Sequence, residues 1–166
     1  MKRNLKKDIA MGLHENMHSE TVSRLALREP VVVQETSTIG EAVTAMRKHQ
    51  LGCAIVLSPN RVPIGLFPES ELTRLLSKNS DVIDEPISKH LKKDWPTVKL
   101  TDPIARVLDA LESYNVRFLI VVNEDGQLAG LTGQKGLMEY VAEHFPGQVN
   151  VQRIGGNPYP VEREGA

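Results

Sequence analysis

The sequence repeats itself at a displacement of 65 residues, which aligns Val22–Asn79 with Ile87–His144 without a gap. Ten of the 58 paired positions are identical, among them Gly65 with Gly130, and many other pairs agree in residue type. Repeated units stack on one another to share a buried core. Because a solenoid needs about three or more units, two copies predict a pseudo-twofold pair instead.

Each copy contains the same series of expected elements. Apolar residues within 39–46 and 104–111 recur at helical spacing, with Thr38 as an N-cap and Pro103 in the first turn of the second helix. The apolar runs 53–57 and 118–122 predict buried strands, and short strands at 63–67 and 127–132 lead into helices at 69–77 and 134–144. A short extended segment, 31–33 or 97–98, opens each copy. The predicted fold class is therefore α+β, with two tandem β-α-β-β-α repeats.

Composition excludes several classes of protein. With 20 basic and 21 acidic residues the net charge is −1, so we expect no binding of nucleic acid through a basic surface. The longest apolar runs have five residues, far short of the ~20 that span a bilayer. The single cysteine, Cys53, excludes a disulfide framework and is expected to pack in the core. No secretory signal is readable, so we expect a cytoplasmic protein without a membrane partner.

The order of these elements and their residues resembles the CBS domain, and the tandem arrangement resembles the CBS pair known as a Bateman module. The matching stretches are Pro30–Met46 and Gly65–Leu72 in the first copy, then Thr97–Ile104, Arg117–Val122 and Gly130–Leu137 in the second. The resemblance implies two sheets packed back to back and a further dimerisation into a flat disc. It also implies a regulatory role, in which adenine nucleotides bind in clefts between the copies.

The resemblance divides the chain into four parts. Residues 1–20 form a basic segment expected to be helical, residues 21–80 the first CBS domain, and residues 81–145 the second. We expect the C-terminal tail, residues 146–166, to be mostly disordered, with one local strand at 149–154.

The turn that holds nucleotides in this family has diverged in both copies. The family pattern is Gly, two apolar residues, Thr or Ser, two variable residues and Asp, whose hydroxyl and carboxylate grip ribose and phosphate. Here Pro68 and Glu71 stand at the hydroxyl and acid positions of the first copy, and Gly133 and Gly136 stand there in the second.

Two candidate clefts follow from the family pattern, each joining the end of one copy to the front of the other. The residues of the first are Leu66, Ser70, Glu71, Leu91, Asp94, Pro96, Val116 and Arg117. The residues of the second, weaker cleft are Ala26, Glu29, Val31, Leu51, Gly52, Leu131, Gly133, Lys135 and Gly136.

Each cleft has a functional and a structural interpretation. Arg117 could hold a phosphate and Glu71 a ribose, or Glu71 could simply favour the first turn of a helix. The glycines of the second cleft could expose backbone N–H groups to an anion, or serve only a tight turn.

One further motif, His14-Glu15-Asn16-Met17-His18, matches H-E-x-x-H, in which two histidines hold zinc and the glutamate acts as a base. Such a site needs a third ligand and its own catalytic domain, whereas a repeat begins a few residues later. We therefore expect a solvated N-terminal helix, with no metal site and no catalytic residues.

These observations predict a regulatory module that is not an enzyme and needs no cofactor. AMP, ADP or ATP is the expected regulatory ligand, and the expected partners are a second copy of the chain and an unidentified regulated protein. The alternative is a nucleotide-free interaction or dimerisation scaffold with degenerate clefts.

Overall fold

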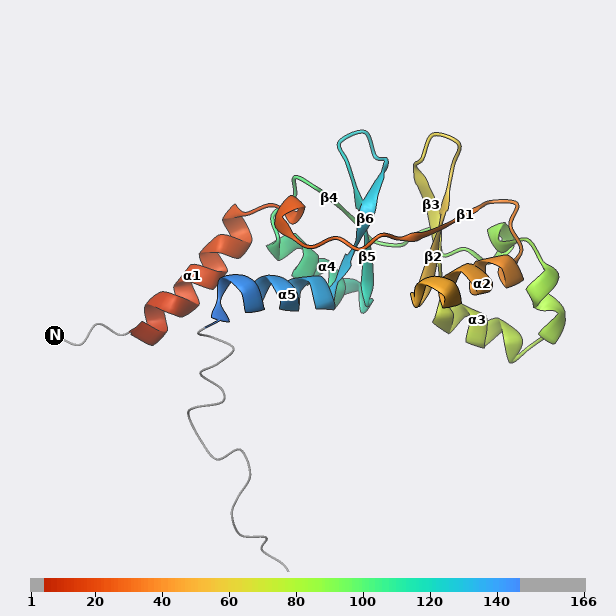
Figure 1. The fold of residues 1–166 in the computed structure, drawn as a ribbon, viewed down its shortest axis with the longest axis horizontal. Helices are drawn as coiled ribbons and strands as arrows, with labels where there is room; N and C mark the ends of the chain where they lie inside the picture. Colours follow the sequence, from red (N-terminus) through yellow and green to blue (C-terminus); the bar gives the residue numbers. More distant parts are fainter. Residues whose placement is uncertain (1–4, 147–166) are drawn as a thin grey trace, which may run out of the picture.

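A computed structural model of the chain describes residues 5–146, with side chains from Gly12 onward. The strand expected at 149–154 lies outside the described residues. Two three-stranded sheets stand side by side in the middle of an elongated molecule, each with its helices on the outer side (Figure 1).

The two repeats contain the same elements in the same order. The first contains β1 (Val31–Gln34), α2 (Ile39–His49), β2 (Cys53–Leu57), β3 (Pro63–Pro68) and α3 (Glu69–Leu76). The second contains β4 (Thr97–Lys99), α4 (Ala105–Tyr114), β5 (Phe118–Val122), β6 (Leu128–Gly133) and α5 (Gln134–His144). The predicted β-α-β-β-α unit and the α+β class are thereby confirmed.

The sheets share one topology and one register. In the first, β1 pairs in parallel with β2, and β2 pairs antiparallel with β3, giving the order β1-β2-β3. Val32 faces Ile55 in this sheet, and Thr97 faces Ile120 in the other, so the strands keep the 65-residue displacement of the sequence repeat. Helix α2 is the crossover that a parallel pair requires.

Local residue chemistry explains where the first helices begin and end. Thr38 and Glu41 form a capping box at the start of α2, with the Thr38 hydroxyl accepting from the Glu41 N–H at 3.2 Å. Gln50 ends α2 in the left-handed conformation at φ 52°. The prediction for Pro103 was wrong: α4 begins at Ala105, and Pro103 lies in the preceding turn, where its C=O accepts from Arg106 N–H at 2.9 Å.

Side-chain alternation along the strands divides the core into three clusters. On β2, Ala54 and Val56 face the helices of the first repeat, whereas Cys53 and Ile55 face the other sheet. The central cluster between the sheets joins both repeats through Cys53, Ile55, Leu66, Ile120, Val122 and Leu131. This shared apolar layer holds the two sheets face to face.

The segment that leads into each repeat packs on the other repeat. Val22 and Leu25 are buried in the core of the second repeat, and the Ile104 N–H donates to the C=O of Glu20 at 2.9 Å. Val82 and Ile87 occupy the equivalent positions in the core of the first repeat. Because both repeats borrow part of their core from the other, the pair is interlocked rather than merely adjacent.

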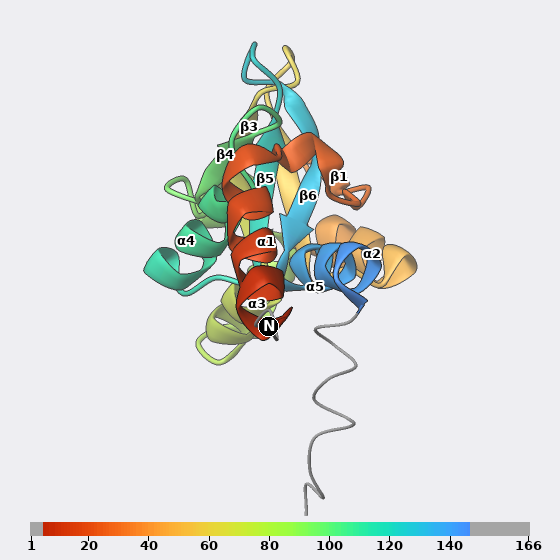
Figure 2. The same ribbon diagram turned by 90° about the vertical axis from the view of Figure 1, so that its left-hand side faces the viewer.

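Helix α1 (Leu5–Ser19) covers the outer end of the second repeat. Leu13 and Met17 pack against its core beside Phe145 of the α5 end, and Figure 2 shows α1 in front of α4 and α5. The 3₁₀ helix η2 (Ser80–Asp84) covers the first repeat in the same way. Within residues 5–146, no helix has the length and apolar character needed to cross a membrane.

The histidines of the H-E-x-x-H motif lie on the solvent side of α1. Their rings are 4.3 Å apart between centroids, and His18 Nδ1 forms a 2.8 Å hydrogen bond with the C=O of His14. Among the described residues, no group of three or more potential metal ligands comes together. The third ligand that a catalytic zinc site requires is therefore not supplied by this part of the chain.

Candidate functional site

Each cleft is bounded by a linker laid along the edge of a sheet. Lys92 pairs with Leu66 on β3, and Arg28 pairs in the same antiparallel manner with Leu131 on β6. The two N–H···O bonds of the Arg28 bridge measure 2.8 and 3.0 Å. A linker from one repeat thus meets the β-to-α turn of the other on both sides of the molecule, as the family pattern implies.

The linkers follow a displacement of 64 residues rather than 65. Leu27 covers Gly130 and Leu91 covers Gly65, with the Leu Cβ 3.1 and 3.0 Å from where a glycine Cβ would lie. These contacts make both glycines necessary, since any side chain there would have to displace the linker. The linker into β4 is consequently one residue longer, because the strands that follow return to the 65-residue register.

The carboxylate expected to hold ribose in the first cleft is bound within its own helix. Glu71 is buried, and the Arg74 Nε donates to both of its carboxylate oxygens at 3.1 Å. A side-chain hydrogen bond from Arg74 lowers the pKa of Glu71, aided by the charges of Arg74, Lys92 and His90 against the effect of burial. A ligand must therefore compete with an internal guanidinium for this acid.

The rest of the first-cleft set does not come together as one site. Leu66 lies in the central core, Leu91 packs on the core of the first repeat, and Val116 packs on that of the second. Ser70 is exposed on α3. The remaining residues lie elsewhere: Asp94 and Pro96 line a separate cavity against α4, and Arg117 lines the second cleft.

The second cleft contains a small cavity of about 30 Å³. Six of the predicted residues line it: Ala26, Leu51, Leu131, Gly133, Lys135 and Gly136. Gly52 lies at its edge, where an added Cβ would be 3.8 Å from the Phe118 ring. Glu29 is exposed and Val31 is buried in the core of the first repeat, because the displaced linker turns Arg28 toward the cavity instead.

Four lining residues were missed by sequence reasoning: Arg28, Arg117, Phe118 and Thr132. Arg117 was assigned to the other cleft, and Arg28 requires knowledge of the linker displacement. Thr132 stands one residue before the position where the family carries a hydroxyl, so the motif comparison passed over it.

Thr132 is the most unusual residue of the second cleft. It is 4% exposed, yet its Oγ1 has no hydrogen-bond partner among the described residues. An unpaired buried hydroxyl costs about 1–3 kcal/mol, so such groups are rare without a function or a bound partner. Gly136 makes room for it, since a Cβ there would lie 2.8 Å from the Thr132 Oγ1.

The turn at Gly133 also requires glycine. A Cβ at Gly133 would lie 2.2 Å from the backbone oxygen of Arg117, closer than any side chain tolerates. The hydroxyl residue of the family pattern cannot occupy this position in the observed backbone conformation. The sequence divergence at Gly133 and Gly136 is therefore part of how this cleft is shaped.

Positive charge gathers around this cavity. Arg28, Arg117 and Lys135 line it, and the first N–H groups of α5 open toward it at the positive end of the helix dipole. Lys135 pairs with Glu139 at 3.6 Å, whereas neither arginine has an ion-pair partner within the described side chains. The arrangement suits an anionic ligand.

Cys53 plays no part in either cleft. It is fully buried in the central cluster, and burial raises the pKa of its thiol to about 12. A thiol that stays protonated at neutral pH is a poor nucleophile, consistent with the packing role predicted from the sequence.

Two sheets joined back to back, with linkers that cross between the repeats, define a tandem CBS pair. The CBS domain family matches residues 22–78 and 87–143, so the chain belongs to the CBS domain family. The family generally provides regulatory, non-catalytic modules.

Two relatives show how this module is used in other chains. An uncharacterized 17.7 kDa protein of Acidianus ambivalens is 32% identical over 117 residues, 70% of each chain. The glycine betaine/carnitine transport ATP-binding protein of Listeria monocytogenes is 27% identical over 111 residues, 67% of this chain but only 26% of that protein.

Solved structures with the same fold include ligand complexes. A CBS domain protein from Pyrobaculum aerophilum complexed with AMP has a TM-score of 0.64 and 26% identity, covering 74% of this chain and 99% of its own. The CBS domain pair of protein MJ0100, in complex with 5′-methylthioadenosine and S-adenosyl-L-methionine, has a TM-score of 0.66 at 15% identity, covering 75% and 97%.

Proposed function

We propose that this chain is a regulatory sensor that binds an adenine nucleotide in its second cleft and signals to a partner protein. The observation that carries the proposal is the unpaired, buried hydroxyl of Thr132 in a cavity bordered by Arg28 and Arg117. The AMP complex of the Pyrobaculum protein supports the choice of ligand. The chain itself acts without catalysis.

The residues of the second cleft divide the work of binding. The guanidinium groups of Arg28 and Arg117 and the α5 N-terminus would hold phosphate, since guanidinium pairs with phosphate through two parallel hydrogen bonds. Leu51 and Phe118 offer apolar surface for the base. The site lacks an acid for the ribose hydroxyls, so we expect affinity to depend strongly on the phosphate.

Binding in this cleft requires movement. A cavity of about 30 Å³ holds a water molecule or two rather than a nucleotide. The linker at Arg28 and the Phe118 ring must therefore move apart when the ligand enters. Because Arg28 belongs to the segment that crosses between repeats, this opening changes how the repeats meet, and a partner protein can detect that change.

We assign one nucleotide to each chain. In the first cleft Glu71 is already paired with Arg74, and Arg117 lies at the other cleft. This assignment reverses the sequence-based preference for the first cleft. It follows from the 64-residue displacement of the linkers and from the closed Glu71–Arg74 pair.

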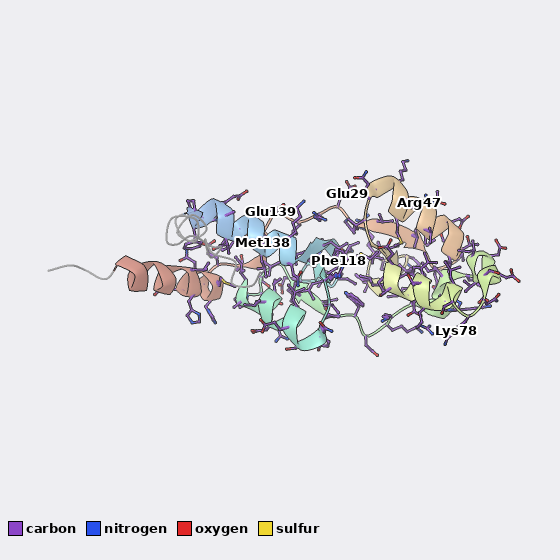
Figure 3. The ribbon with its side chains drawn as sticks, turned by 90° about the horizontal axis from the view of Figure 1, so that it is seen from below. Glu29, Arg47, Lys78, Phe118, Met138 and Glu139 are labelled. Atoms are coloured by element: carbon purple, nitrogen blue, oxygen red, sulfur yellow. The ribbon has the colours of Figure 1, made fainter. Side chains whose placement is uncertain are left out.

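The proposed partners are a second copy of the chain and a separate regulated protein. Leu76, Leu108 and Met138 are 42%, 41% and 72% exposed on α3, α4 and α5, where they provide apolar surface for dimerisation (Figure 3). The Listeria relative joins a similar module to a transport ATP-binding protein, so an ATPase is one kind of partner to test.

A second candidate is a nucleotide-free scaffold. The small volume of the second cavity and the internal pairing of Glu71 favour it, because both leave little room for a ligand. The two candidates differ in one measurable property, which is stabilisation by nucleotides.

The experiment is a calorimetric and thermal-shift titration with AMP, ADP, ATP, S-adenosylmethionine and NAD. A ligand at 100 times its Kd stabilises the fold by about 2.7 kcal/mol, which is easily detected. We expect an adenine nucleotide to bind at one site per chain, and Arg117→Gln to weaken it about tenfold or more. Lys78→Gln, at the far end of α3 in Figure 3, removes an equal charge and serves as the matched control.

The first-cleft variant Glu71→Gln should leave nucleotide affinity unchanged. If it abolishes binding while Arg117→Gln does not, the assignment to the second cleft is wrong. If no nucleotide binds at millimolar concentration, the scaffold is the correct alternative.

A further inference from the structure

A cavity of about 480 Å³ lies outside both clefts, between the linker into β4 and helix α4. Its volume is within the usual range for small-molecule sites. Asp94 and Trp95 border it from the linker, and Arg106, Asp109 and Tyr114 border it from α4. No feature of the CBS motif requires these residue types at these positions.

The cavity lies where the symmetry between the repeats breaks. The linker that ends at β4 has one residue more than the linker that ends at β1, as the two displacements of 64 and 65 residues require. In this longer linker Trp95 packs on the central cluster, and its Nε1–H donates to the C=O of Phe118 at 2.9 Å. The flanking Asp94 stays exposed at the cavity.

The charged groups around the cavity are not used within the protein. Arg106, Asp109 and Ser113 stand at i, i+3 and i+7, along one face of α4. Among the side chains that the structure describes, six ion pairs occur, and none includes Asp94, Arg106 or Asp109. Two carboxylates and one guanidinium therefore surround an open cavity with a net charge of −1.

We propose that this cavity is a binding site for a dibasic α-amino acid such as L-arginine or L-lysine. Arg106 pairs with the ligand carboxylate, and Asp94 and Asp109 receive its two cationic groups. Tyr114, 60% exposed, and Trp95 supply aromatic surface for the alkyl chain and the cation. The ligand charge of +1 then balances the cavity, which a neutral amino acid or a nucleotide would not do.

The site is close enough to the second cleft to report to it. Trp95 borders the cavity, while Phe118, whose carbonyl accepts the indole N–H, lines the cleft. Trp95 is also the single tryptophan of the chain, so its fluorescence is a direct probe of this cavity.

The test is a fluorescence and calorimetric titration of the full chain with L-arginine and L-lysine to millimolar concentration, without nucleotide. Cadaverine lacks the carboxylate, L-norleucine lacks the second cation, and L-glutamate has the opposite charge. Asp109→Asn is the test variant. Glu112→Gln removes the same charge from an exposed position of α4 outside the cavity and is the matched control.

We expect saturable binding of both dibasic amino acids and at least about tenfold weaker binding of the three other compounds, the effect of losing a charge-assisted contact. Asp109→Asn should weaken binding by a similar factor, and Glu112→Gln should not. Arg106→Gln should remove the preference for L-lysine over cadaverine. The proposal is overturned if no dibasic amino acid binds, if L-norleucine binds equally well, or if folded Asp109→Asn binds like the wild type.

Discussion

The substitution Thr132→Val tests whether the buried hydroxyl of the second cleft is kept for a ligand. Valine preserves the shape of threonine but replaces the hydroxyl with a methyl group. The unpaired Oγ1 of Thr132 costs the free protein about 1–3 kcal/mol, so removing it should raise the free energy of unfolding by a similar amount. Each kcal/mol corresponds to a rise in Tm of roughly 2–4 °C in a chain of about this size.

The same substitution should reduce the response to nucleotide. If the hydroxyl binds the ligand, the stabilisation produced by AMP at fixed concentration becomes smaller in Thr132→Val, although the free variant is more stable. Differential scanning fluorimetry with and without AMP measures both quantities on one sample. A gain in stability together with a loss of ligand response is not expected of a residue that only packs.

Thr44→Val is the matched control, because the Thr44 hydroxyl is exposed on α2 and already donates to the C=O of Gly40 at 2.9 Å. It should change stability by less than about 0.5 kcal/mol and leave the AMP response intact. The reasoning is refuted if Thr132→Val destabilises the free protein, or if it responds to AMP as the wild type does.

Three further predictions concern stability and reactivity. Arg61 has φ 63° in the β2–β3 turn, where the second repeat has Gly126 at φ 76°, so Arg61→Gly should raise the urea midpoint by up to about 1 kcal/mol; a lower midpoint would contradict this. The pKa of Glu71 is lowered by Arg74, so their interaction stabilises the fold above the unfolded pKa and is lost as pH falls through the lowered folded value. Unfolding curves of Arg74→Gln should therefore approach those of the wild type in acid, and a difference independent of pH would exclude this linkage. The Cys53 thiol, with a pKa of about 12, should react with a disulfide reagent only at the rate of unfolding, and rapid labelling of the native protein would show that it is accessible.

The fold is largely predictable from the order of residues because its elements rest on local patterns. The runs Cys53–Leu57 and Phe118–Val122 became strands with the predicted bounds, and α5 occupies the predicted Gln134–His144. Thr38 caps α2 because a hydroxyl and Glu41 three residues later satisfy two backbone N–H groups. Pro103 was misplaced because a turn before α4 suits its fixed φ as well as a first helical turn does.

The candidate site was less predictable because it depends on segments that meet only after folding. A uniform 65-residue displacement placed Glu29 and Asp94 in the clefts, whereas the linkers follow a displacement of 64. The contacts of Leu27 on Gly130 and of Leu91 on Gly65 fix this shift, and no local pattern reveals it. The structure thereby moves Arg28 into the second cleft and leaves Asp94 at a separate cavity.

Duplication, strand periodicity and capping are encoded within a few neighbouring residues, so the chain's own pattern was sufficient for the repeat, the order of elements and the family. The pairing of Glu71 with Arg74, the isolation of the Thr132 hydroxyl and the position of Arg117 depend on how close the two repeats approach. Those distances are set by packing across the central cluster and by the crossing linkers. Tertiary structure alone therefore decides which cleft is open to a ligand and which is closed.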